Sequence, residues 1–189
     1  HMDSIRERIQ LDGVPLEEEP FWQSASVVRE VESRLFEEWG AFNYFEILTA
    51  MMFIVFQQEA VDLAIIEVGI GGLLDNTNVG HPLVSVITTI GLDHQDLLGS
   101  TLEEITAQKA GIIKSGQQVV VGPVSCECMD VIRGVASEKG ATVQAFSKDF
   151  FLIEESYQDS SLTIPLKQLA LQGAFQKENA TVAIRAFCA

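Results

Sequence analysis

The chain has 189 residues, and its 12 Lys and Arg against 27 Asp and Glu give a formal net charge of −15. This acidic balance argues against a protein that binds nucleic acid or an anionic membrane, because both need clustered basic side chains. Hydrophobic residues make up 47% of the chain, which excludes wholesale disorder. No apolar run reaches the roughly 18 residues of a membrane span.

The length and the cysteines bound the organisation of the protein. At roughly 150 residues per domain, we expect one domain over residues 1–189. The three cysteines are an odd number without a CxxC pair, which favours a reducing cytoplasm over a disulfide framework.

Two helices are predicted in the first third of the chain. Apolar residues recur at helical spacing between residues 21 and 39, and Gly40 follows them as a helix C-cap. Residues 44–58 are more uniformly apolar, which predicts a second, buried helix.

After residue 60 the pattern changes to short apolar runs that end in glycine or polar residues. Runs of this kind are typical of strands covered on both faces, as in a parallel sheet. The predicted strands are residues 63–68, 84–90 and 119–121. The predicted helices of this part are residues 102–113, 127–139 and 176–187. Residues 150–155 and 161–166 flank a polar turn and predict an antiparallel hairpin.

This alternation predicts an α/β fold, a doubly wound and mostly parallel sheet with a C-terminal antiparallel hairpin. Ligands of such sheets bind beyond the carboxyl ends of the strands. Glu67 interrupts an apolar strand near its carboxyl end, so its carboxylate must be paired, protonated or bound to a cation. His94 follows the next strand and could complete a cation site with Glu67. An exposed strand end or a buried ion pair for Glu67, and a structural loop histidine, are the alternatives.

The helix after His94 places a lysine among apolar residues. Thr101 and Glu104 fit a capping box that starts this helix. At roughly 100° per residue, Lys109 shares one face with apolar neighbours at positions 102, 105 and 112. Burial disfavours the charged ammonium, and a neutral amine could act as a nucleophile or take up CO₂ as a carbamate. A lysine whose charged end reaches solvent is the alternative.

Several segments, in order along the chain, resemble the folylpolyglutamate synthase/dihydrofolate synthase family of the Mur ligase superfamily. Residues 67–79 read EVGIGGLLDNTNV and are similar to the family signature EVGLGGRLDATNV. The other similar segments are residues 5–13, 44–50, 91–94, 108–112 and 173–180. The resemblance runs from about residue 5 to residue 186, and it predicts a Mur ligase-like ATPase domain that is truncated.

The resemblance implies an ATP- and Mg²⁺-dependent amide ligase that adds L-glutamate to a folate or to dihydropteroate through an acyl phosphate. Glu67 and His94 would then be Mg²⁺ ligands, and Lys109, once carbamylated, would help to hold a second metal ion. Metal ions would neutralise charge on the transferring phosphoryl group. The resemblance assigns catalysis to Lys109 and Asp75. It assigns substrate or nucleotide binding to Asp75, Asn78, Gln176 and Asn179, the last two toward the adenine.

The sequence also departs from the family. Leu73 stands where the family has arginine, Asn76 replaces alanine, and Phe175 replaces histidine. No Gly-Lys-Ser or Gly-Lys-Thr phosphate loop occurs in the chain, and the C-terminal ligase domain is expected to be missing. We therefore expect the isolated chain to bind ATP poorly and not to catalyse ligation.

Three further expectations concern alternatives and partners. One alternative is a noncatalytic binding or assembly protein that keeps the fold, which the departures favour. Another is a metal-dependent hydrolase using Asp93 and His94, although the additional carboxylates of such sites are missing. Loss of an interior strand would expose a sheet edge and apolar surface, so self-association is also expected.

Overall fold

The structure is a computed structural model that describes residues 3–171 and 173–189. The chain divides into two compact units, His1–Gly69 and Ile70–Ala189. The prediction of one domain over residues 1–189 stays a prediction. No helix in the described ranges is both long and apolar enough to cross a membrane.

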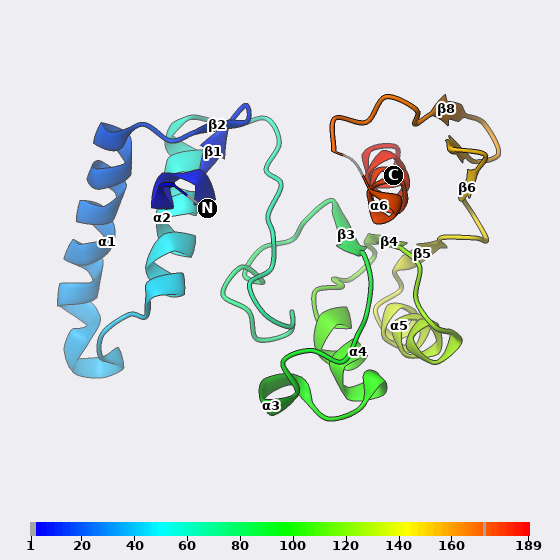
Figure 1. Cartoon of the computed structure of the whole chain (residues 1–189). Helices are drawn as coiled ribbons and strands as arrows, with labels where there is room; N and C mark the ends of the chain where they lie inside the picture. The colour runs from blue at the N-terminus through cyan, green and yellow to red at the C-terminus, as the bar shows by residue number, and fades with distance from the viewer. Residues whose placement is uncertain (1–2, 172) are drawn as a thin grey trace. The chain divides into compact units, whose positions relative to one another are not determined.

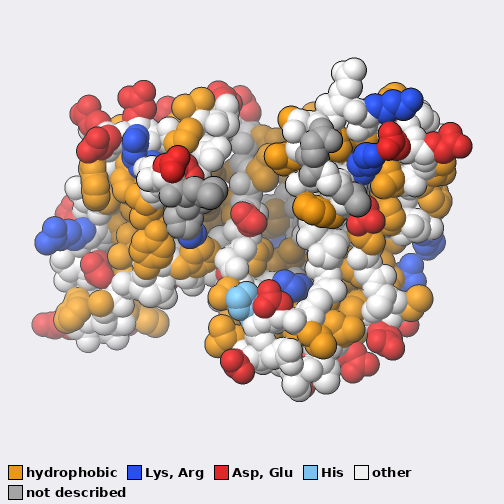
Figure 2. All heavy atoms as spheres, in the orientation of Figure 1, with side chains coloured by type: hydrophobic (Ala, Val, Ile, Leu, Met, Phe, Trp, Pro, Cys, Tyr) orange, Lys and Arg blue, Asp and Glu red, His pale blue; other side chains and the backbone are white. Residues whose placement is uncertain are grey.

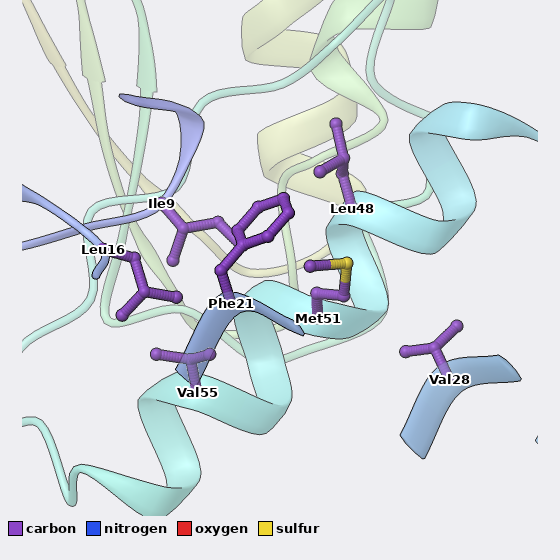
Figure 3. Packing of buried hydrophobic residues seen from close by; sticks show 7 residues of the cluster. All are labelled: Ile9, Leu16, Phe21, Val28, Leu48, Met51 and Val55. Carbon is purple, nitrogen blue, oxygen red and sulfur yellow. The ribbon is translucent and has the colours of Figure 1, made fainter. Parts of the chain in front are cut away.

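The first unit is built on two helices. A 3-10 turn, η1 (Ile5–Arg8), and a small antiparallel ribbon of β1 (Gln10–Leu11) and β2 (Val14–Pro15) precede α1 (Glu18–Trp39) and α2 (Tyr44–Gln58). Both predicted helices are confirmed, and α2 has the predicted bounds. Their core contains side chains from the 3-10 turn region, the ribbon and both helices (Figure 3): Ile9, Leu16, Phe21, Val28, Leu48, Met51 and Val55.

The second half of α1 carries apolar side chains that are not buried. The last buried residue of this helix is Val28, and Phe36 and Trp39 are exposed. The periodic pattern therefore predicted the helix correctly but overstated how much of it the core covers.

The strand predicted at residues 63–68 is wrong. This segment forms no strand, and Leu63 and Ile65 are exposed by 60% and 88%. A run of β-forming residues becomes a strand only when a neighbour satisfies its backbone N–H and C=O groups. No strand in the described ranges pairs with residues 63–68.

The second unit contains a parallel sheet of three strands in the order β3 (Val84–Ile87), β4 (Gln118–Val121) and β5 (Thr142–Ala145). Val119, Val120 and Val121 of the central strand are fully buried. Helices α4 (Leu102–Ala110) and α5 (Cys126–Glu138) supply one core layer, and α6 (Ala174–Phe187) supplies the other. Figure 1 shows α4 and α5 on one side of the strands and α6 on the other. The predicted doubly wound α/β fold is confirmed.

Some elements differ from the prediction. Strand β3 ends at Ile87 and helix α4 ends at Ala110, each three residues before its predicted end. Strand β5 and the short helix α3 (Gln95–Leu98) were not predicted. The predicted hairpin is a meander of β6 (Phe151–Ile153), β7 (Ser156–Gln158) and β8 (Thr163–Pro165).

The meander has a local cause that composition does not reveal. Glu154 and Glu155 both have positive φ, 46° and 63°, and this reverses the chain between β6 and β7. Hairpin turns of this hand usually contain Asn or Gly, so two glutamates carry no turn signal in the sequence.

A partly buried ion pair joins the meander to α6. Arg185 Nη1 lies 3.0 Å from Asp159 Oδ2, and Arg185 Nε donates to the side chain of Gln144 in β5. The Tyr157 hydroxyl donates to the same carboxylate. This bond and the backbone N–H of Ser161 hold the pKa of the Asp159 carboxyl well below its usual range.

We predict that Asp159→Asn lowers the stability of the chain at pH 7. A carboxyl whose pKa is depressed by folding stabilises the fold above its unfolded pKa, about 3.9. That contribution is lost as the pH falls through the lower, folded pKa. Urea unfolding should therefore show a clear difference in midpoint between the variant and the original chain at pH 7, and a shrinking difference below about pH 4.

The control is Asp130→Asn, which changes an exposed carboxylate on α5 and should leave the midpoint unchanged. A difference between Asp159→Asn and the original chain that is constant from pH 7 to pH 2 would contradict the role of this carboxylate.

Candidate functional site

Residues 70–78, hereafter the glycine loop, carry Asp75 in a fixed turn. The Asp75 carboxylate accepts hydrogen bonds from the backbone N–H of Ile70 at 2.9 Å and of Thr77 at 3.0 Å. It also accepts one from the Thr77 hydroxyl. The carboxylate predicted to face a substrate thus organises the loop that carries it.

The glycine loop lies in close contact with α3 and α4. A Cβ on Gly71 would come within 2.7 Å of the Leu98 side chain, which belongs to α3. A Cβ on Gly72 would lie 2.8 Å from the Gln108 carbonyl oxygen and 2.9 Å from that of Lys109. Only glycine leaves room for backbone to meet backbone here.

The same contact is tight from the side of α4. A Cβ on Gly111, the C-cap of this helix, would lie 2.4 Å from Cβ of Leu73. The Leu73 N–H donates to the Gln108 carbonyl at 2.8 Å. The Gly111 N–H donates to the same carbonyl at 3.3 Å, so the loop adds a second and shorter hydrogen bond at the end of the helix.

Lys109 sits in this last turn of α4, half-buried. The capping box of Thr101 and Glu104 that starts the helix is confirmed. Of the apolar neighbours predicted to share a face with Lys109, Ile105 is fully buried and Leu102 is half-buried. Ile112 lies beyond the helix end, so the predicted apolar face is shorter than expected.

His94 is the N-cap of α3 and is exposed. Its backbone is left-handed, with φ 51°, and its N–H donates to the Asp93 carboxylate at 2.8 Å. Its Nε2 lies 3.7 Å from the other oxygen of that carboxylate. Because α3 contacts α4 and the glycine loop contacts both, the elements that carry Asp75, His94 and Lys109 are neighbours.

Glu67 belongs to the first unit, whereas His94 and Lys109 belong to the second. Its side chain is exposed in the segment that forms no strand. Glu67 is not buried, so burial does not force its carboxylate to be paired, protonated or bound to a cation. Its exposure agrees with the alternative of an exposed position, although the segment is not a strand. Among the described residues, no three His, Cys, Asp or Glu side chains gather as a metal site. The metal-ligand role of Glu67, His94 and Lys109 stays a prediction.

Gln176 and Asn179 lie in the first half of α6, half-buried and exposed respectively. This helix packs on the sheet face opposite α4 and α5. The two residues are therefore on a different element from the glycine loop, and their nucleotide role stays a prediction.

One buried polar residue, Gln117, was not predicted from the sequence. Gln117 is 6% exposed, accepts from the backbone N–H of Lys114 at 2.8 Å and donates to the Pro82 carbonyl at 2.9 Å. A glutamine directly before an apolar strand was the signal available in the sequence.

On the face that Figure 2 shows, acidic side chains are spread over the surface and basic side chains are scattered among them.

Comparison with known proteins places this fold and loop in a class. The model of the Mur ligase middle domain matches residues 30–187, and the chain belongs to the Mur ligase family. The match extends across both compact units. The resemblance found in the sequence is thereby confirmed.

The similar proteins are folylpolyglutamate synthases. That of Lacticaseibacillus casei is 36% identical over 96% of this chain and 45% of its own length. A dihydrofolate synthase/folylpolyglutamate synthase of Bacillus subtilis is 34% identical over 97% of this chain and 45% of its own. The chain spans about half the length of the curated relatives it matches.

Solved structures agree with these relatives. A Mycobacterium tuberculosis folylpolyglutamate synthase complexed with ADP superposes with a TM-score of 0.92 at 30% identity, over 98% of this chain and 45% of that one. A complex of such a synthase with AMPPCP and folate gives a TM-score of 0.89 at 36% identity, over 97% and 47%.

We predict that Gly111→Ala destabilises the chain by about 1–3 kcal/mol, the usual cost of forcing extra atoms into a packed contact. The backbone of Gly111 has φ −60° and ψ −14°, which alanine adopts freely, so the cost reports the contact with Leu73 alone. Urea unfolding measures it.

The matched control is Gly134→Ala inside α5, where an added Cβ meets nothing within 4 Å. That substitution should stabilise the chain by about 0.4–1 kcal/mol. Equal stability changes in the two variants would show that the glycine loop does not press on the end of α4.

Proposed function

We propose that this chain is part of the ATPase domain of an ATP-dependent ligase that adds L-glutamate to a folate or to dihydropteroate. The observation that carries the proposal is the glycine loop with Asp75, fixed by backbone contacts to the helix end that holds Lys109. The names of its relatives and the complexes of similar proteins with AMPPCP, ADP and folate support it. The single family match over residues 30–187 supports one domain over residues 1–189.

The chemistry proposed for the site is electrostatic. Mg²⁺ would be held by Glu67 and His94, and by Lys109 once this lysine carries a carbamate. Carboxylate oxygens and imidazole are donors that divalent cations accept, and the exposed imidazole of His94 is open to one. A bound cation would neutralise the negative charge of a phosphoryl group.

The position of Lys109 links the carbamate to the cation. In the last turn of a helix a positive side chain is favoured, because the carbonyl ends give that turn partial negative charge. A carbamate would replace the positive charge with a negative one at the same place. A cation bound beside it offsets that cost, so CO₂ uptake by Lys109 and cation binding are expected to favour each other.

Asp75 is proposed to face the acyl substrate through the loop that it organises. Gln176 and Asn179 on α6 are proposed to contact the adenine. The same proposal includes a location in the cytoplasm, because the proposed ligase would need a supply of folate and ATP.

A noncatalytic binding or assembly role is the second candidate. Leu73 and Phe175 are exposed by 47% and 62%, so two apolar side chains face solvent where the family has arginine and histidine. The exposed apolar residues of α1 are consistent with self-association.

The ligase proposal can be tested with a chimera in which this chain replaces the matching part of the L. casei synthase. We expect the chimera to form glutamylated folate with ATP, and Lys109→Ala to reduce the rate by at least about 100-fold, as loss of a charge-stabilising group does. The control is Lys148→Ala, at an exposed lysine that should not matter. The 189-residue chain alone should yield no product. A folded chimera without activity, or equal activity in both variants, would contradict the ligase proposal.

The cation site can be tested on the 189-residue chain with Mn²⁺ in place of Mg²⁺, using the electron paramagnetic resonance signal of free Mn²⁺. We expect His94→Asn to weaken binding by about tenfold or more. Asparagine keeps the left-handed backbone of this position available.

His81→Asn is the control, because His81 is an exposed histidine of the same unit without a proposed role. If both substitutions leave the affinity for Mn²⁺ unchanged, His94 is not a ligand.

A further inference from the structure

The side chain of Asn78 joins two parts of the chain that are far apart in sequence. Its Nδ2 donates to the carbonyl of Leu73 at 3.0 Å, within the glycine loop, and to that of Gly111 at 3.2 Å, just beyond α4. One amide therefore binds the loop to itself and to the helix end at the same time.

Lys114 fixes the backbone of the same asparagine. Its Nζ donates to the Asn78 carbonyl at 3.2 Å, so Asn78 is held through its side chain and through its main chain. Four residues later, the carbonyl of Pro82 accepts from the buried Gln117 at 2.9 Å. Gln117 is itself fixed by the hydroxyl of Ser85 at 3.0 Å. The stretch between the loop and β3 is thus tied at both ends to the residues that follow α4.

These bonds decide where the loop lies, because the loop contains no regular secondary structure. Its direct backbone link to α4 is the Leu73 N–H to the Gln108 carbonyl, at 2.8 Å. The contacts of Gly72 and Gly111 prevent the loop from moving closer, but they do not prevent it from moving away. Besides the Leu73 bond, the bonds of Asn78 to Gly111 and of Lys114 to Asn78 supply that restraint.

We propose that Asn78 is a positioning residue, supported by Lys114, which holds the glycine loop against the end of α4 and so keeps Asp75 and Lys109 in fixed relative places. The proposal rests on the proposed function, since only there do Asp75 and Lys109 act together. Asn78 acts on the chemistry through the loop.

Hydrogen exchange of single amides in the 189-residue chain, followed by NMR, tests this role. Asn78→Asp removes both donated bonds and turns a carboxylate toward two carbonyl oxygens. We expect the Leu73 N–H to exchange about tenfold faster or more. The N–H of Gly122 bonds to the Ile87 carbonyl at 2.8 Å, inside the sheet region, and should be unaffected.

The matched control is Asn76→Asp, the same chemical change in the same loop. The side chain of Asn76 makes no hydrogen bond within the described ranges, so this variant should leave the exchange of Leu73 unchanged. For Lys114 we expect Lys114→Met to accelerate that exchange and Lys114→Arg to preserve it.

Three results would overturn the proposal. The first is unchanged exchange of the Leu73 N–H in Asn78→Asp, and the second is that Asn76→Asp accelerates this exchange equally. The third is equal acceleration of the Leu73 and Gly122 N–H groups in Asn78→Asp, which would report loss of global stability. The affinity for Mn²⁺ separates this proposal from the cation site. A chain that binds no Mn²⁺ contradicts the proposed cation site, while the exchange rates still decide the role of Asn78.

Discussion

The candidate site depends on one constraint, the direct contact of backbone with backbone between the glycine loop and the end of α4. A Cβ on Gly72 would clash with the Gln108 and Lys109 carbonyls, and a Cβ on Gly111 would clash with Leu73. The Leu73 N–H donates to the Gln108 carbonyl at 2.8 Å, and the same carbonyl also accepts from the N–H of the C-cap Gly111 at 3.3 Å. A loop of nine residues without secondary structure thereby acquires a fixed place beside Lys109. Its glycines are required by distance, and no phosphate is needed to explain them.

How far the sequence predicted this arrangement depends on the range of the interactions involved. Helix α2 and the buried strand β4 follow from local periodicity, and both were predicted. The strand expected at residues 63–68 failed because strand formation needs a neighbour, which no local pattern guarantees. The role of Asn78 depends on a carbonyl 33 residues away, so it could be seen only in the structure.

The site residues divide in the same way. Family resemblance named Asp75, His94 and Lys109, and the structure places them on elements in mutual contact. It named Glu67 equally, but this residue is exposed in the other compact unit, so its role rests on resemblance alone. Reasoning from burial failed for Glu67, because it presumed a strand that does not form. Lys109 is half-buried, and the chemistry expected of its amine stays a prediction. In the proposed cation site, His94 and Lys109 are therefore the residues whose placement in the structure supports their role.

The central claim is that the glycine loop is hydrogen-bonded to the end of α4. The most direct measurement is the scalar coupling across that hydrogen bond, between the amide nitrogen of Leu73 and the carbonyl carbon of Gln108, in the isotope-labelled chain. The account predicts a measurable coupling, because the N–H and the carbonyl oxygen form a bond with an N···O distance of 2.8 Å. A well-resolved Leu73 amide signal with no such coupling, in a chain where the sheet amides show theirs, would contradict it.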